Sequence, residues 1–147
     1  MTTAGPDPDG DIVLRRAFGW GVLFIGDAEA DIVEVEPDSV ITWGREDQTV
    51  AVLVRHAQDV DDEVLDALHD DDEVPDAEVA VSVHWGPLVD GKPVDEGVIA
   101  VHSGRVSVGD ADHENSFSVA PGRWHVQIGL EPIQHAERID VWLSRAD

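Results

Sequence analysis

The chain has 147 residues, with 32 Asp and Glu against 9 Lys and Arg, which gives a formal charge of −23. Nucleic acids and anionic membranes bind through Lys and Arg, so this charge disfavours both as direct partners. The chain has no cysteine, which excludes disulfides, thiol nucleophiles and thiolate metal sites. Hydrophobic residues make up 42% of the chain, which argues against wholesale disorder.

The length favours one domain, which we expect to span residues 12–147. Residues 1–11 are acidic and rich in turn-forming residues, and this composition predicts a disordered tail rather than the basic and apolar start of a secretory leader. The longest apolar run, 20–25, has the length of a buried strand and falls short of the roughly 20 residues that span a bilayer. We therefore expect a soluble, cytoplasmic protein.

Short segments rich in Val, Ile, Leu and aromatic residues, separated by glycines and polar turns, predict β-strands along most of the chain. A polar four-residue stretch between 39–43 and 49–55 suits a hairpin. The spacing of the segments is typical of an all-β protein, and we predict an antiparallel β-sandwich of about eight or nine strands with one short helix between its halves. Ten segments are candidates for these strands: 12–18, 19–25, 39–43, 49–55, 77–85, 98–101, 105–108, 116–120, 123–130 and 138–143.

The helix is predicted where the period of the apolar residues changes. Val60, Val64, Leu65 and Leu68 follow helical spacing, and the acidic residues 61–63 suit the amino-terminal end of a helix dipole. We expect the helix to end near 69, because the acidic run that follows opposes the dipole and a proline at position 75 interrupts hydrogen bonding.

Negative charge is concentrated around this helix. The stretch 59–76 holds ten acidic residues in 18 positions and no Lys or Arg. Such a block is often a solvated surface, but it also suits a basic cleft on a partner. A tryptophan on the polar face of the last strand is predicted to cover a sheet edge or to meet a partner. The candidate partner-binding residues are Asp61, Asp62, Glu63, Asp66, Asp70, Asp71, Asp72, Glu73 and Trp142.

No pattern in the sequence predicts a catalytic, cofactor-binding or metal-binding site. The seven histidines lack the paired spacing that directs two imidazoles at one ion. No serine lies in a Gly-x-Ser-x-Gly elbow, and neither a phosphate-binding loop nor a dinucleotide fingerprint is present. The five tryptophans are expected to fill the core rather than to line a carbohydrate site.

Two short echoes relate the halves of the chain. Gly-Asp-Ala occurs at 26–28 and again at 109–111, which indicates a strand that runs into a tight turn. The sequence His-Ala occurs at 56–57 and again at 135–136 in similar surroundings. Both turn chemistry and duplication of a β unit are compatible with these echoes.

From residue 39 onward the layout resembles a known family. The elements that carry the likeness are the hairpin 39–54, the strand and turn at 98–104, the segment 117–126 with its central Pro-Gly, and the last strand 139–143. This layout resembles the competence-protein-J family, small bacterial proteins that inhibit a DNA-entry nuclease. The resemblance implies a non-enzymatic β-sandwich that binds a protein, and it assigns no inhibitory residue to this chain.

Three functions are compatible with these observations. The first is an inhibitor or immunity-type binding protein whose acidic surface occupies a basic protein such as a nuclease. The second attributes the acidity to a high-salt cytoplasm, which agrees with one lysine beside eight arginines. The third, an enzyme that uses a carboxylate pair or a bound metal, is disfavoured because no motif supports it.

Overall fold

Ten β-strands and one short helix make up the regular structure of the described residues. The computed structural model describes residues 12–19, 21–30, 38–44, 48–69, 71–110 and 114–146. The elements are β1 (Ile12–Ala17), β2 (Val22–Asp27), β3 (Ile41–Trp43), β4 (Thr49–Leu53), α1 (Asp62–Asp66), β5 (Glu78–Trp85), β6 (Asp95–Val101), β7 (Arg105–Gly109), β8 (Glu114–Ser118), β9 (Gly122–Glu131) and β10 (Arg138–Arg145).

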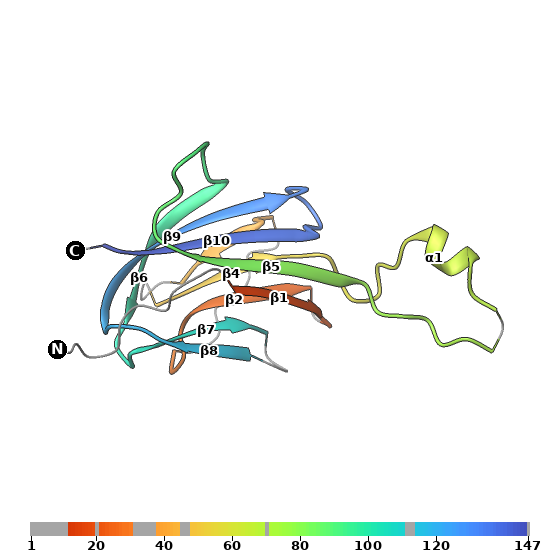
Figure 1. Ribbon diagram of the computed structural model, residues 1–147, viewed down its shortest axis with the longest axis horizontal. Helices are drawn as coiled ribbons and strands as arrows, with labels where there is room; N and C mark the ends of the chain where they lie inside the picture. Colours follow the sequence, from red (N-terminus) through yellow and green to blue (C-terminus); the bar gives the residue numbers. More distant parts are fainter. Residues whose placement is uncertain are drawn as a thin grey trace.

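The strands form two five-stranded sheets that pack against each other (Figure 1). Sheet A has the strand order β1-β5-β10-β9-β6, and sheet B has the order β3-β4-β2-β7-β8. The predicted β-sandwich and the helix between its halves are therefore confirmed. The described strands number ten rather than eight or nine. The predicted tail at 1–11 lies outside the described residues, and no helix within them is long and apolar enough to cross a membrane.

Most strand pairs are antiparallel, but β5 and β10 are parallel neighbours in sheet A. The predicted antiparallel β-sandwich is confirmed as the fold class, and this parallel pair is a feature that the prediction did not include. Parallel neighbours need a long crossover connection, and here the chain from β6 to β9 provides it. The predicted hairpin is confirmed, since β3 and β4 pair antiparallel with Trp43 opposite Val50.

The core is built from alternating apolar residues on the inner faces of both sheets. On β5, β9 and β10 the residues that alternate in sequence are the buried ones, as the period of two predicts. Each fully buried valine or isoleucine contributes about 1.5–3 kcal/mol. The side chains least exposed to solvent in the core are Phe18, Leu23, Ile25, Ile99, Ile128, Ile139, Leu143, Val50, Val52, Val79, Val81 and Val83.

Two polar contacts join the sheets at their margins. Arg16 on the inner side of β1 forms an ion pair of 2.8 Å with Asp110, which follows β7 and is buried. The Arg16 guanidinium also lies 4.7 Å from the centre of the Phe18 ring. Separating the two groups would leave the buried Asp110 carboxylate without this partner, so the contact constrains how the two sheets pack.

The second contact joins β3 to β6. The indole nitrogen of Trp43 donates a hydrogen bond of 3.0 Å to the Asp95 carboxylate. The indole ring lies over Gly97, where an added Cβ would be 2.8 Å from the ring carbon Cη2. The absence of a side chain at this position therefore lets the tryptophan close that margin of the sandwich.

Asp27 organises the turn that leads into β7. Its carboxylate accepts hydrogen bonds from the N–H groups of Glu29 at 3.1 Å, His102 at 2.8 Å and Ser103 at 3.3 Å, and from the Ser103 hydroxyl. Burial raises the pKa of Asp27, but the hydrogen bonds from Ser103, Glu29 and His102 outweigh it, so the pKa lies below its ordinary value.

The Gly-Asp-Ala echo thus has a structural meaning at its first copy. Asp27 receives the backbone N–H two residues later, as turn chemistry predicts. Strands β2 and β7 pair antiparallel, with Phe24 opposite Gly109, so the two aspartates Asp27 and Asp110 lie at opposite ends of that pair. Residue 111, at the end of the second copy, lies outside the described residues.

We predict that Asp27→Asn lowers the free energy of unfolding by about 1–3 kcal/mol at neutral pH, because an amide cannot accept all the hydrogen bonds that the carboxylate accepts. The folded pKa is below the unfolded value of about 3.9, so this stabilisation is present above that pH and is lost as the pH falls through the folded pKa. Urea unfolding of both proteins across this range measures it. Asp90→Asn, at an exposed loop position, is the control. An equal effect of the two substitutions, or a difference that does not shrink in acid, contradicts the prediction.

Candidate functional site

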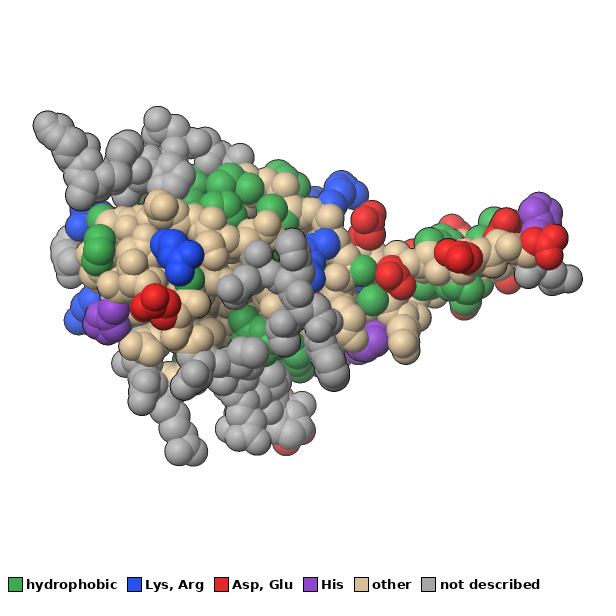
Figure 2. All heavy atoms as spheres, turned by 90° about the horizontal axis from the view of Figure 1, so that it is seen from below, with side chains coloured by type: hydrophobic (Ala, Val, Ile, Leu, Met, Phe, Trp, Pro, Cys, Tyr) green, Lys and Arg blue, Asp and Glu red, His purple; other side chains and the backbone are tan. Residues whose placement is uncertain are grey.

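The most prominent feature outside the sandwich is a projection between β4 and β5, made of residues 59–76 and called here the acidic arm (Figure 1). Acidic and hydrophobic side chains are interspersed on its surface (Figure 2). Val64, Leu65 and Val74 have exposed fractions of 38%, 41% and 59%. The arm therefore presents both charge and apolar surface to solvent.

Local sequence explains why the arm forms a helix, but the helix does not pack against the sandwich. Asp61 precedes the helix with extended backbone angles, and its carbonyl accepts the N–H groups of Val64 and Leu65. Asp62 and Glu63 occupy the first turn, where negative charge suits the dipole. The helix ends at Asp66, earlier than predicted, and buries none of its residues. A short helix without a packed apolar face gains little stability from lengthening.

Two alanines close the base of the arm, which we call the neck. Ala57 and Ala77 are buried, and the N–H of Ala77 donates a hydrogen bond of 2.7 Å to the carbonyl of Ala57. The N–H of Ala57 in turn donates to the carbonyl of Phe18 at 3.0 Å. The two ends of the arm are thereby joined to each other and to the sandwich.

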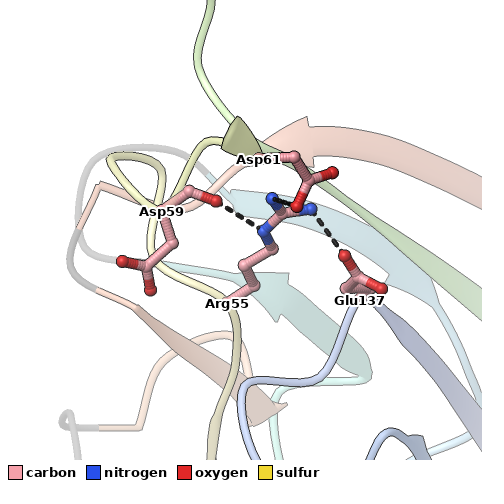
Figure 3. Close-up of polar contacts among 4 residues, drawn as sticks. All are labelled: Arg55, Asp59, Asp61 and Glu137. Atoms are coloured by element: carbon pink, nitrogen blue, oxygen red, sulfur yellow. Dashed lines mark hydrogen bonds and ion pairs between the residues drawn. The ribbon is translucent and has the colours of Figure 1, made fainter. Parts of the chain in front are cut away.

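Arg55 holds the first residues of the arm (Figure 3). Its guanidinium donates to the carbonyl of Asp59 at 2.8 Å, to the Asp61 carboxylate at 2.7 Å and to the Glu137 carboxylate at 2.6 Å. The Arg55 side chain is 13% exposed. An isolated exposed ion pair contributes little, but one planar guanidinium with three acceptors fixes their relative positions.

An open cavity lies beside the neck, with a volume of about 510 Å³. Of its lining residues, Gly21 and Val54 are buried, while Asp38 and Asp59 are exposed. No group of three or more His, Asp or Glu side chains in the described ranges is placed to hold a metal ion. The lining residues are Gly21, Asp38, Ser39, Val40, Leu53, Val54, His56, Asp59, Gln134 and His135.

The second echo of the sequence comes together at this cavity. Val54 and Ala136 form a parallel bridge, and His56 and His135, close to it in sequence, both line the cavity. The Nδ1 atom of His56 accepts the N–H of Gln58 at 3.0 Å, so a neutral His56 carries its proton on Nε2. His135 has a φ of 55°, an uncommon backbone conformation for a residue other than glycine.

Trp142 lies far from the acidic arm. It is on β10, an interior strand of sheet A, so it does not cover a sheet edge. Its ring stacks on His84 with a centroid distance of 5.1 Å, and an added Cβ on Gly129 would be 3.3 Å from it. His84 is also the register partner of Trp142 on β5. It lies six residues from Glu78, which is at the end of β5 nearest the arm, and six strand residues span about 20 Å.

The structure therefore separates the predicted site residues into two places. The acidic ones that are described lie together on the arm and are exposed, while Trp142 belongs to the outer face of sheet A. Asp70 lies outside the described residues. Arg55, Glu137 and the cavity were not predicted. The repeated His-Ala was the one signal in the sequence that pointed to the cavity, since the histidine of each copy lines it.

Comparison with solved structures identifies proteins of similar fold. ComJ from Bacillus subtilis, an inhibitor of the DNA-degrading activity of NucA, is similar with a TM-score of 0.55 and 8% sequence identity, over 92% of this chain and 96% of that one. The product of crocagin biosynthetic gene J has a TM-score of 0.49 and 14% identity, over 93% of this chain and 96% of that one. No protein-family model and no curated protein sequence matches the chain. The resemblance to the competence-protein-J family is thus confirmed for the fold.

We predict that Arg55→Lys loosens the base of the arm, because an ammonium group cannot reach three acceptors arranged around a planar guanidinium. Hydrogen exchange of the Ala57 and Ala77 amides measures the effect, and we expect it to accelerate by about tenfold, which corresponds to the loss of about one charged hydrogen bond. Arg138→Lys is the matched control, since Arg138 is exposed and lies 4.0 Å from Glu131. Unchanged exchange at the neck in Arg55→Lys would show that Arg55 does not hold the arm.

Proposed function

We propose that the protein is a non-enzymatic, inhibitor-type binding protein, acting in the cytoplasm, whose acidic arm inserts into a basic cleft of a protein partner such as a nuclease. The observation that carries the proposal is the form of the arm. It projects from the sandwich, its helix buries none of its residues, and Arg55 and the neck hold its base. A segment that adds nothing to the core while carrying this charge is suited to contact with another molecule.

Charge is distributed along the chain in a way that supports a basic partner. No Lys or Arg occurs between positions 55 and 92, a range that contains the whole arm. The local field of the arm is therefore not offset by cations in its own sequence. A concentrated field of this kind accelerates association with a molecule of opposite charge and makes the association sensitive to salt.

The exposed apolar side chains of the arm support binding rather than steering alone. Three exposed apolar side chains lie among the acidic residues, those of Val64, Leu65 and Val74. The surface of the arm is therefore partly apolar and not only charged. Charges at the rim of an interface mainly affect the rate of association, whereas desolvated apolar groups slow dissociation. A nuclease cleft offers cations because it binds phosphates, and carboxylates on an arm can take the place of those phosphates.

We predict that replacing three arm carboxylates by amides, in Asp62→Asn, Glu63→Gln and Glu73→Gln together, abolishes capture of the partner from an extract of the source organism at low salt. The control variant carries Glu29→Gln, Asp90→Asn and Glu131→Gln, which makes the same change of charge at exposed positions of the sandwich. We expect the control to capture the partner as the wild type does. A nuclease captured in this way should lose activity when the wild-type protein is added.

The same experiment contains the results that contradict the proposal. Equal capture by the arm variant and the wild type would exclude the arm as the binding surface. Equal losses by the arm variant and the control would mean that net charge, and not the arm, attracts the captured protein. A captured nuclease that stays fully active in the complex would exclude inhibition.

A second explanation, adaptation of the surface to high salt, is favoured by the acidic residues that lie outside the arm. Only ten of the 32 acidic residues are in the arm, and the chain has one lysine. Under this explanation the free energy of unfolding should rise steeply between dilute buffer and molar KCl. We predict instead a modest dependence on KCl, together with partner capture that weakens as KCl is added. Urea unfolding and the capture assay at matched KCl concentrations distinguish the two, and a protein that unfolds in dilute buffer supports salt adaptation.

A further inference from the structure

The cavity beside the neck has an apolar interior and an anionic rim. Of its lining residues, Gly21 and Val54 are buried, and Val40 and Leu53 are half-buried. Asp38 and Asp59 line the cavity and are exposed. Its volume of about 510 Å³ falls within the range of small-molecule pockets.

The charge of the rim is not neutralised from within. None of the described residues that line the cavity is Lys or Arg. Arg55 is adjacent in sequence to two lining residues, but its guanidinium is directed to the Asp59 carbonyl and to the carboxylates of Asp61 and Glu137. In Figure 3 the Asp59 carboxylate points away from that guanidinium. A ligand with positive charge is therefore favoured at the rim.

An apolar base below an anionic rim suits a ligand with an alkyl stem and a cationic end. Lys and Arg side chains have this form, since they bury their methylene groups along apolar surface while the charged group stays near water. We propose that the cavity binds an Arg or Lys side chain of the protein partner that contacts the acidic arm. The cavity adjoins the base of the arm, because Asp59 is both its lining residue and the first residue of the arm.

This inference rests on the proposed function for the source of the side chain, but its test does not need the partner. The probe is N-acetyl-arginine-N-methylamide, which presents the side chain on a capped backbone. Its titration is followed by NMR from the imidazole signals of His56 and His135, which both line the cavity. We expect saturable shifts of these two signals and smaller shifts of His84, which lies on β5 away from the cavity.

Three comparison ligands separate the contributions of the alkyl stem, the charge and the backbone. N-acetyl-norleucine-N-methylamide has the stem without the charge, and the guanidinium ion has the charge without the stem, so both should bind at least about tenfold more weakly. n-Butylguanidinium has both but no peptide groups. If n-butylguanidinium saturates the site and the capped arginine does not, the cavity takes free cations, and a partner side chain is excluded.

Paired variants test whether the rim carboxylates act locally. Asp38→Asn with Asp59→Asn should weaken binding of the capped arginine by about tenfold, because each carboxylate lies near the bound cation. Asp71→Asn with Asp72→Asn makes the same change of net charge on the arm and should weaken it by less than about twofold. Asp59 contacts Arg55 through its backbone carbonyl, so this substitution keeps that hydrogen bond.

The outcomes distinguish this inference from the proposed function. Absence of saturable shifts at His56 and His135 in the wild-type protein would overturn the cavity as a side-chain site, whatever the variants do. Equal weakening by the two variant pairs would overturn local recognition. Partner capture that depends on the arm, with no effect of Asp38→Asn and Asp59→Asn on capture, would leave the proposed function standing and exclude the cavity from it.

Discussion

A single guanidinium, that of Arg55, joins the sandwich, the arm and the segment before β10. Its side chain donates to Asp59, Asp61 and Glu137, while its backbone N–H donates to the carbonyl of Ala136 at 3.0 Å. The backbone contact places residues 54 and 136 side by side, and the side-chain contacts set where the arm begins. The cavity wall and the direction of the arm therefore depend on the same residue, since both are built from its immediate neighbours.

The local part of this structure could be predicted, because the information lies in short patterns. The apolar residues of β5, β9 and β10 alternate in the sequence as the buried residues do in the structure, and helical spacing with acidic residues located α1. The parallel pairing of β5 and β10 could not be predicted, since alternation is the same in parallel and antiparallel strands. The end of the helix was missed because its apolar residues found no surface on which to pack, so Val64 and Leu65 stayed exposed.

The candidate site was predictable only where charge is contiguous in sequence. The acidic residues of the arm are close together along the chain, and they remain close in space. The Arg55 contact with Glu137 joins residues 82 positions apart, and nothing in the sequence marks Arg55 among eight arginines. The repeated His-Ala was visible, but its meaning required the bridge between Val54 and Ala136. Trp142 was grouped with the arm because it lies on the polar face of the last predicted strand, and the strand order places it elsewhere.

Our proposal of a binding partner, rather than adaptation to salt, rests on the concentration of the charge and not on its amount. Ten like charges within 18 residues repel one another, and the helix of the arm buries nothing that would offset this. Opposite charge can relieve that repulsion in two ways. Dissolved ions act on any exposed carboxylate, so adaptation to salt gives no reason to gather acids on a projection held by its own arginine and neck. A cationic cleft acts only where charges are gathered and presented, and it also covers the apolar side chains that the arm leaves exposed. The form of the arm is therefore the one that our proposal of a basic binding partner requires.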